Sequence, residues 1–562
     1  MPEYLAPGVY IEELATGPVP IEGVSTSTAG FIGQTVRGPL EPRLVTSWLD
    51  FQRWYGGLTD PFALRSYLPF AVKGFFDNGG RRAYIARIAR TAAPRPGTGT
   101  PATTSTVTLG TGGAEDLLLT ALGPAPLAGR LFAWVGPPAS AMPDTAIDAG
   151  PFRIILLYYD TAPPAGSTPS DVDPLNPANA ADGNRVEPDV VEDFDNLQID
   201  PEDPNFVLTA IQRSTLVTAA FSPDTATPSV PDATGFDSAS GNRTYEAAAG
   251  GDTGSGEMLL DDFLGAAPTP TSRGSGLEGL RAIDEIAILS APDEGHPSAD
   301  LAPVRGELRA GVILQCEQLK DRFAVVQLTQ GDGDPSTITP PVDTSYGAVY
   351  VPWLRILDPA TGDTHLVPPG GHVAGIYART DIERGVHKAP ANAVVRGIVA
   401  TELPGNRGPL SVTITRAQQD ILNPRNVNVI RDFRSDRRGV RVWGARTMSS
   451  NAQWKYVNVR RLFIFVEESV EEGTQWVVFE PNDEPTWARV RRSISNFLTS
   501  VWRSGALMGT TAEEAFFVKC DRTTMTQDDI DSGRLICYVG IAPVKPAEFV
   551  IFRFSQKTVE AS

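Results

Sequence analysis

A linker that interrupts an alternating pattern of strands and helices constrains the fold of this 562-residue chain more than any other feature. Strand-like and helix-like segments alternate over residues 29–91, and a similar alternation resumes near residue 285. After Thr91 the sequence turns to APRPGTGTPATTSTVT, and short apolar runs separated by Pro, Asp, Ser and Gly continue to about Ser272. This sequence pattern therefore predicts a discontinuous α/β domain that carries a large insertion.

The two segments of the discontinuous domain, 29–91 and 273–422, both have the pattern of an α/β fold. In the first, AGFIGQTVRG predicts a strand and a turn, Ser47 is positioned to cap the helix in SWLDFQRWY, and Gly56 to end it. A second helix and the strand RAYIARI follow. In the second segment, DEIAILSAPD, a helix over Leu308–Leu319 and RFAVVQL form a strand, helix and strand unit, which implies parallel strands.

The rest of the folded chain divides in two. Residues 92–272 are predicted to form an inserted β-rich domain with mobile loops, because runs such as RLFAWVG and FRIILLYYD are short and lie between Pro- and Gly-rich stretches. Beyond Leu422 the pattern changes, and residues 423–545 are predicted to form an α+β domain. The chain as a whole is thus expected to be a multidomain α/β and α+β protein.

A helix expected from Pro485 to Gly505 has two contrasting faces. Its apolar positions recur at helical spacing and are Trp487, Val490, Ile494, Phe497, Leu498, Val501 and Trp502. Arg489, Arg492 and Arg503 fall on the opposite side. We expect the apolar face to pack against the domain, and the cationic face to be either a contact for an acidic partner or a solvated surface.

Both chain ends are predicted to be extended arms with one strand each. The N-terminal arm, 1–28, has a single apolar cluster, Val9, Tyr10 and Ile11, after Pro7-Gly8. The C-terminal arm, 546–562, has apolar residues on both faces of EFVIFRFSQ, centred on Val550, Ile551 and Phe552. A strand that is isolated in this way needs a partner sheet for its backbone and its side chains.

Charge and composition argue against several classes of protein. The net charge of −19 would repel a phosphate backbone, so nucleic acid is not expected as the main partner. No apolar run is long enough to span a bilayer, and the N-terminus has no apolar signal core, so membrane insertion and export by that route are not expected. Cys316, Cys520 and Cys537 occur singly and are interpreted as small core residues in a reducing cytoplasm.

Motifs of catalytic or metal sites are few, and each lies in the wrong context. Asp252-Thr253-Gly254 matches the triplet of aspartic proteases but lies in AAAGGDTGSGE, which is expected to be a flexible linker. Asp531-Ser532-Gly533 is expected to end a helix. His365 and His372 lack a carboxylate or cysteine at ligand spacing and are assigned to a loop. We therefore predict no enzyme activity, no metal site and no cofactor.

Several blocks of the sequence resemble the contractile tail sheath family, which is shared by myophage tails, R-type bacteriocins and phage-like extracellular injection systems. Near the start these blocks are YLAPGVYIEE, STSTAGFIG and YLPFAVKGFFDNGGRRAYIARI. In the centre they are YVPWLRILDP, VPPGGHVAGIYARTDIERGVHKAPAN and ILNPRNVNVIRDF. The C-terminal quarter is most similar, with VRVWGARTMSS, WKYVNVRRLFIFVEESVEEGTQWVVFEPND, GALMGTTAEEAFFVKCD and KPAEFVIFRFSQ.

The resemblance implies a structural subunit that polymerises as stacked hexameric rings around an inner tube protein, with baseplate and terminal cap proteins as further partners. Such a sheath is assembled in the bacterial cytoplasm as part of a phage tail or tail-like particle, and contracts to drive the tube through a target envelope. The family's central domain is described as subtilisin-like, so a hydrolase is one alternative, and a passive capsid or adhesion protein is another.

One loop is more basic than the family pattern implies. Its arginines in DFRSDRRGVRVWG are Arg431, Arg434, Arg437 and Arg438. They are candidates for a lattice or tube contact, and a solvated loop is the alternative.

Overall fold

The computed structural model describes residues 20–58, 66–91, 100–109, 117–142, 145, 147, 151–221, 230–255, 258–296, 301–329, 334–359, 361–400 and 408–554. The chain divides into two compact units. The larger contains 25–383 and 389–457, and the smaller contains 1–24, 384–388 and 458–562. The predicted strand at Val9, Tyr10 and Ile11 lies outside the described residues. The protein is a mixed α/β multidomain chain, as the sequence predicts.

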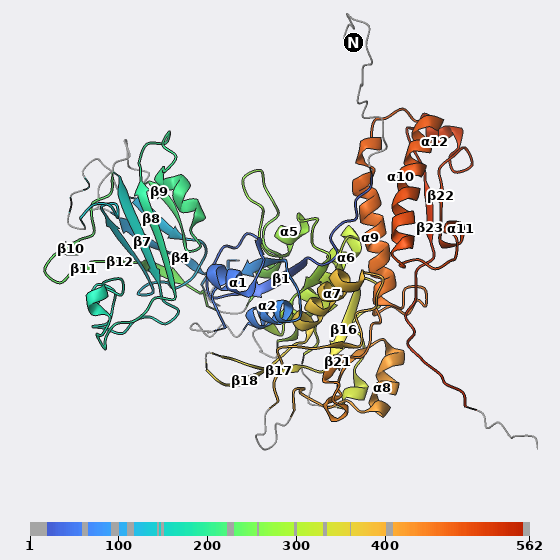
Figure 1. Ribbon diagram of the computed structural model, residues 1–562, viewed down its shortest axis with the longest axis horizontal. Coiled ribbons are helices and arrows are strands. Elements are labelled where there is room, and N and C mark those ends of the chain that lie inside the picture. The colour runs from blue at the N-terminus through green and yellow to red at the C-terminus, as the bar shows by residue number, and fades with distance from the viewer. Residues whose placement is uncertain are drawn as a thin grey trace, which may run out of the picture. The chain divides into compact units, whose positions relative to one another are not determined.

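A nine-stranded sheet forms the centre of the larger unit (Figure 1). Its order is β19 (Ala393–Val394), β21 (Val440–Val442), β20 (Asn428–Asp432), β16 (Gly347–Val351), β15 (Phe323–Val326), β14 (Ile288–Ser290), β1 (Ala29–Gln34), β3 (Ala83–Ile88) and β2 (Arg43–Val45). The six strands from β20 to β3 are parallel, and the pairs at the two edges are antiparallel. The expected parallel pairing of β14 and β15 is confirmed.

Helices connect these strands. They are α1 (Trp48–Tyr55), α2 (Leu68–Asp77), α4 (Leu260–Leu264), α5 (Gly276–Arg281), α6 (Arg305–Leu319), α7 (Gly370–Arg384) and α8 (Arg416–Leu422). Ser47 caps α1 by accepting a hydrogen bond from the Asp50 N–H, and Gly56 ends it with a φ of +89°, as the sequence predicts. The strands and helices enclose one apolar core, which also includes Met258 and Phe263.

The C-terminal domain was predicted to begin at residue 423, but β20 and β21 extend the central sheet, and the smaller unit resumes only at Asn458. Each of these two strands is short and has only two apolar residues, and such a pattern does not specify which sheet a strand joins. Met258 and Phe263 likewise pack with the central sheet although they precede Ser272. These are differences of boundary within an α/β and α+β chain.

The described residues between 103 and 252 form two four-stranded antiparallel sheets. One has the order β12 (Glu246–Ala247), β6 (Leu131–Gly136), β7 (Phe152–Tyr158) and β8 (Val190–Leu197). The other has the order β13 (Ala249–Asp252), β4 (Thr103–Leu109), β5 (Leu117–Ala121) and β9 (Val217–Phe221). Side chains from both sheets share one apolar core, so the segment is a β-sandwich.

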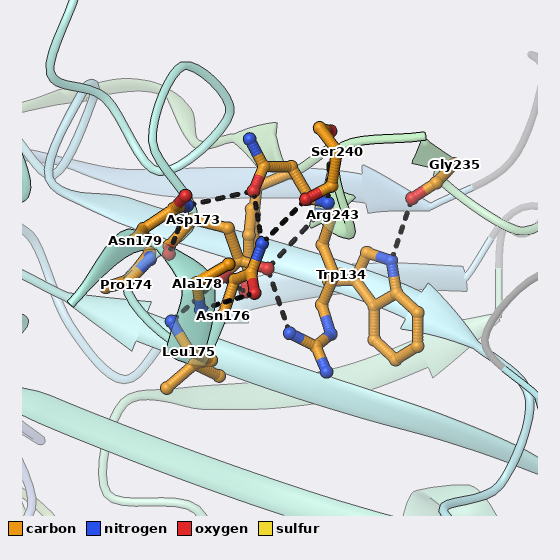
Figure 2. A network of polar contacts seen from close by, with 12 residues as sticks. Trp134, Asp173, Pro174, Leu175, Asn176, Ala178, Asn179, Gly235, Ser240 and Arg243 are labelled. Carbon is orange, nitrogen blue, oxygen red and sulfur yellow. Dashed lines mark hydrogen bonds and ion pairs between the residues drawn. The ribbon is translucent and has the colours of Figure 1, made fainter. Parts of the chain in front are cut away.

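The long loop after β7 is organised around a buried carboxylate. Asp173 accepts a hydrogen bond from Arg243 Nη1 at 2.9 Å (Figure 2). It also accepts one from the Tyr245 hydroxyl at 3.0 Å. Asn176 Nδ2 donates to Asn242 Oδ1 at 2.8 Å in the same network. A Pro- and Asp-rich sequence does not predict such contacts, because they depend on residues about 70 positions apart.

The smaller unit packs two long helices against a short sheet. Its elements are α9 (Val457–Gly473), α10 (Glu484–Arg503), α11 (Ala512–Ala515), β22 (Phe516–Lys519), α12 (Gln527–Asp531) and β23 (Tyr538–Ile541). α9 and α10 lie side by side and share an apolar core with the inner face of the β22–β23 sheet (Figure 1). No helix in the described part of the chain is long and apolar enough to cross a membrane.

Candidate assembly surfaces

The helix α10 has the two faces that the sequence predicts. The Asp483 side chain caps it by accepting from the Thr486 N–H at 2.9 Å, and Pro485 lies in its first turn. Six of the seven predicted apolar residues are buried, and Trp502 is half-buried. The helix begins at Glu484 and ends at Arg503, two residues before Gly505.

The three arginines of the other face, Arg489, Arg492 and Arg503, are exposed. Arg489 already has partners within its own chain: its Nη2 lies 2.9 Å from Glu480 Oε2, and its guanidinium lies 5.3 Å from the centre of the Trp476 ring. Part of the charge at Arg489 is therefore balanced locally. A contact of this face with a tube stays a prediction.

The basic loop between β20 and β21 is shaped by its own arginines. Arg434 and Asp432 form an ion pair of 2.7 Å. Its hydrogen bonds to Asp432 raise the pKa of Arg434. Burial alone would raise the pKa of Asp432, but the hydrogen bonds from Arg434 outweigh it and the net shift is downward.

The other three arginines of this loop have different surroundings. The guanidinium of Arg431 lies 4.9 Å from the centre of the Phe433 ring, and Arg438 lies 5.2 Å from the same ring. Arg437 is exposed and has a φ of +58°, a conformation that L residues rarely adopt. The loop thus presents exposed cations at Arg434, Arg437 and Arg438 on a defined backbone. Their role in the lattice stays a prediction.

The predicted C-terminal strand has no partner strand among the described residues. Residues 545–554 form neither a helix nor a strand. Their large apolar side chains are mostly exposed: Phe549 71%, Val550 68%, Ile551 76%, Phe552 77% and Phe554 95%. Five such side chains within six residues would be a liability in water, which indicates a surface that is covered by another molecule.

The residues weighed as catalytic or metal sites are not brought together. Asp252 is the last residue of strand β13 and pairs with Thr103. The prediction that Asp252 lies in a flexible linker is therefore wrong. Asp531-Ser532-Gly533 ends α12, as predicted. Across the described segments, no group of three His, Cys, Asp or Glu side chains could hold a metal ion.

The two histidines lie in regular structure rather than in the loop that was expected. His365 belongs to β18 (Thr364–Val367), and His372 lies in the first turn of α7. Burial lowers the pKa of His372 to about 4. A Cβ at Gly74 would lie only 2.4 Å from His372 Nδ1, so the imidazole is a packed core group.

Some exposed apolar residues were not predicted as contact residues. Phe479 is fully exposed and has a φ of +70°, which is rare for an aromatic residue. Phe517 and Tyr538 are 59% and 57% exposed on the outer face of the β22–β23 sheet. Alternation in FFVK could have indicated Phe517, whereas Phe479 ends the run WVVF, which has the pattern of a core segment.

Two family models match consecutive parts of this chain. The model of the phage tail sheath protein central domain matches residues 278–448, and that of the phage tail sheath C-terminal domain matches residues 449–557. The chain belongs to the contractile tail sheath family.

Individual relatives agree with this family. A protein of Pseudomonas aeruginosa (strain UCBPP-PA14) named as a prophage major tail sheath protein is 24% identical over 299 residues, which cover 51% of this chain and 74% of that protein. The tail sheath protein of Vibrio phage KVP40 is 26% identical over 222 residues, which cover 39% of this chain and 31% of that protein. The match to the phage protein thus spans less than half of either chain.

Solved structures share the fold along nearly the whole sheath chain. The helical sheath of the anti-feeding prophage in its contracted state is 24% identical, with a TM-score of 0.54 and coverage of 99% of this chain and 100% of that chain. The sheath complex of an extracellular contractile injection system, also contracted, is 22% identical, with a TM-score of 0.53 and coverage of 99% of both chains. A chain of the anti-feeding prophage baseplate matches with a TM-score of 0.52.

The family makes this chain a structural sheath subunit of a contractile tail or injection system. Its relatives are structural tail proteins, which argues against the hydrolase alternative. Absence of enzyme activity stays a prediction, as does the subtilisin-like character of the central sheet.

Proposed function

We propose that this sheath subunit polymerises as helically stacked hexameric rings around an inner tube protein, and that the rings contract to drive the tube through a target envelope. The baseplate and a terminal cap would bound the stack. The observation that carries the proposal is the exposed apolar segment from Phe549 to Phe554, which has no use in a free monomer.

Strand exchange between subunits would cover this segment. Among the described residues the β22–β23 sheet has two strands, and a two-stranded sheet is marginal by itself. Val550, Ile551 and Phe552 of one neighbour and Val9, Tyr10 and Ile11 of another would extend it on its open edges. Backbone hydrogen bonds then hold the subunits together, while the connectors next to Pro546 and Pro7-Gly8 absorb the motion of the rings.

Contraction requires two lattice packings of the same subunit. The extended packing must be kinetically trapped and the contracted packing lower in free energy, so that a baseplate signal releases stored energy without a nucleotide. Joints made of main-chain hydrogen bonds can persist in both packings. We propose no cofactor for this cycle.

Cationic surfaces are the proposed contacts to the tube and within the lattice. Arg489, Arg492 and Arg503 of α10 would face acidic residues of the inner tube, which steers docking and weakens with salt. The loop from Arg431 to Arg438 would contact a neighbouring subunit or the tube.

The sandwich of residues 103–252 is proposed to lie on the outer surface of the sheath and to be dispensable for polymerisation. In terms of domains, we propose an arm over 1–28, a subtilisin-like α/β domain over 29–91 and 273–422, an insertion over 92–272, a tube-facing α+β domain over 423–545 and an arm over 546–562. Since Met258 and Phe263 pack with the central sheet, a deletion of the insertion should end before Met258.

Removal of residues 1–14 tests the proposal. The truncated protein should be a folded, soluble monomer that forms no cylinders, whereas the full chain should form hollow, striated cylinders of two distinct lengths in electron micrographs. Cylinders of normal stability from the truncated protein would contradict strand exchange. Peptide hydrolysis by the purified chain would instead favour the hydrolase, and closed shells would favour a capsid protein.

A further inference from the structure

Two cysteines face each other across the β22–β23 sheet. In the antiparallel register Lys519 pairs with Tyr538, so the next opposed residues are Cys520 and Cys537. Side chains along β22 alternate between partly buried and exposed, and this alternation directs Cys520 inward, where it is buried. Cys537 packs on the same inner face and is partly buried.

The position of this pair in the ladder suits a covalent bond. The Ala542 N–H donates to the Ala515 carbonyl at 2.8 Å, which makes that pair hydrogen-bonded. Hydrogen-bonded and non-hydrogen-bonded pairs alternate, and Cys520 lies an odd number of residues beyond Ala515. Cys520 and Cys537 therefore occupy a non-hydrogen-bonded pair, whose Cα atoms are about 4.5 Å apart. Disulfides span Cα separations of about 4.4–6.8 Å.

Their surroundings separate these thiols from the third cysteine. Trp487 and Met525 enclose the pair in one small apolar cluster. A hydrogen bond from the Cys537 thiol lowers the pKa of Cys520, with a further contribution from the Arg491 guanidinium, whose Nη1 donates to the Cys520 carbonyl at 3.4 Å. Cys316 lies alone in the core of the central sheet, where burial raises the pKa of its thiol.

We propose that Cys520 and Cys537 are a redox-reversible site whose disulfide staples β22 to β23. The co-reactant is the disulfide of a small thiol, such as oxidised glutathione. One sulfur–sulfur bond of that molecule breaks and one forms between Cys520 and Cys537. The two protein sulfurs lose two electrons in all, the two small sulfurs gain them, and the two thiol protons leave on the two small thiols released.

The staple would secure the base of the C-terminal segment. It closes a loop over residues 521–536, which contains α12. Beyond β23, the chain stays paired with Leu507 at Pro543 and then enters the exposed segment that ends at Phe554. A load on that segment reaches β23 directly, and the disulfide prevents β23 from separating from β22 beyond Cys537. This mechanical role rests on the proposed function, whereas formation of the bond does not.

The test uses the full, unassembled chain. It is incubated with oxidised glutathione or with dithiothreitol, alkylated in denaturant and digested for mass spectrometry. We expect one intramolecular link between the peptides of Cys520 and Cys537, while Cys316 is alkylated in both samples. We also expect cleavage by added protease within 521–536 to slow about tenfold or more in the oxidised sample, because the closed loop opens less often. Disulfide-linked dimers, stable glutathione adducts or two unchanged thiols would overturn the proposal.

Two variants and one probe complete the test. Cys537→Ser should abolish the difference in cleavage between oxidised and reduced samples, and Cys316→Ser should retain it. If Cys537→Ser does not fold, dibromobimane on the reduced natural chain decides, because it becomes fluorescent only when it bridges two neighbouring thiols. A fluorescent peptide pair that carries Cys520 and Cys537 supports the proposal, and its absence contradicts it. Cylinder formation is scored separately, so failure of the proposed function would not affect this result.

Discussion

Replacing two apolar residues of the C-terminal segment should prevent assembly without unfolding the subunit. Val550 and Phe552 alternate on one face of the predicted strand and are 68% and 77% exposed in the single chain. Neither belongs to an apolar core of the subunit. The double variant Val550→Ser/Phe552→Ser should therefore have the thermal stability of the natural protein, and its defect should appear only in the joint between subunits.

The size of the effect follows from these exposures. Fully burying a Val or Phe side chain contributes about 1.5–3 kcal/mol, so the exposed fractions of Val550 and Phe552 correspond to roughly 1–2 kcal/mol each on docking. Loss of both costs about 2–4 kcal/mol per joint, and since about 1.4 kcal/mol is a factor of ten, each joint weakens by about 30-fold to several hundredfold. Every subunit in a cylinder makes such joints, so the concentration needed for assembly should rise by at least the factor by which one joint weakens.

The assay measures the concentration above which cylinders form, by sedimentation and by electron microscopy of the pellet. A matched control is Met142→Ser/Val191→Ser, which replaces two exposed apolar residues at 71% and 45% exposure that precede β7 or lie in β8. The control should assemble like the natural protein. If the Val550/Phe552 variant also assembles at the natural concentration, the exposed segment does not join subunits and the reasoning from exposure is wrong.

Three further predictions address charge, pH and the insertion. Arg492→Glu/Arg503→Glu should abolish tube-templated assembly at low salt, and unchanged assembly would make the cationic face of α10 a solvated surface. Burial raises the pKa of Glu294 to about 8, so the folded state holds a proton that the unfolded state loses above about 4.5, and stability should fall as pH rises from 4.5 to 8. In the Glu294→Gln variant, the free energy of unfolding measured in urea should no longer fall between pH 5 and pH 8. An unchanged pH dependence would contradict the assignment. Deletion of residues 103–252 with a short Gly/Ser closure should leave cylinders intact, whereas a folded subunit that cannot assemble would make the sandwich part of the lattice.

Local signals predicted the elements that local interactions determine. The cap at Ser47, the stop at Gly56 and the place of Pro485 in the first turn of α10 follow from residues within one helical turn. The parallel pairing of β14 and β15 follows from the length of the helix between them. In these cases the residues that decide the structure are neighbours in the sequence, so the pattern was sufficient.

Prediction was weakest where distant residues decide the structure. Nothing near β20 and β21 distinguishes a strand of the central sheet from a strand of a new domain. The loop around Asp173 has a disordered composition and is held by Arg243 and Tyr245. Cys520 and Cys537 were read as separate core residues, because only the register of β22 and β23 makes them opposite each other. Arg434 and Arg489 are exposed, but their ion pairs with Asp432 and Glu480 could not be read from the pattern. Their contacts in the sheath stay predictions.

An apolar pattern also cannot distinguish a core from an interface, and this limit explains the smaller unit. Phe479, Phe517, Tyr538 and the segment from Phe549 to Phe554 have the hydrophobicity of core residues, yet all are exposed in the single chain. A monomer gains nothing from such side chains, whereas a subunit that is covered by its neighbours buries them at every joint. The same residues that look misplaced in one copy are thus expected to be ordinary core residues of the assembled sheath. A sequence that is selected for the assembled state therefore predicts the environment of each residue in the sheath better than its environment in the isolated subunit.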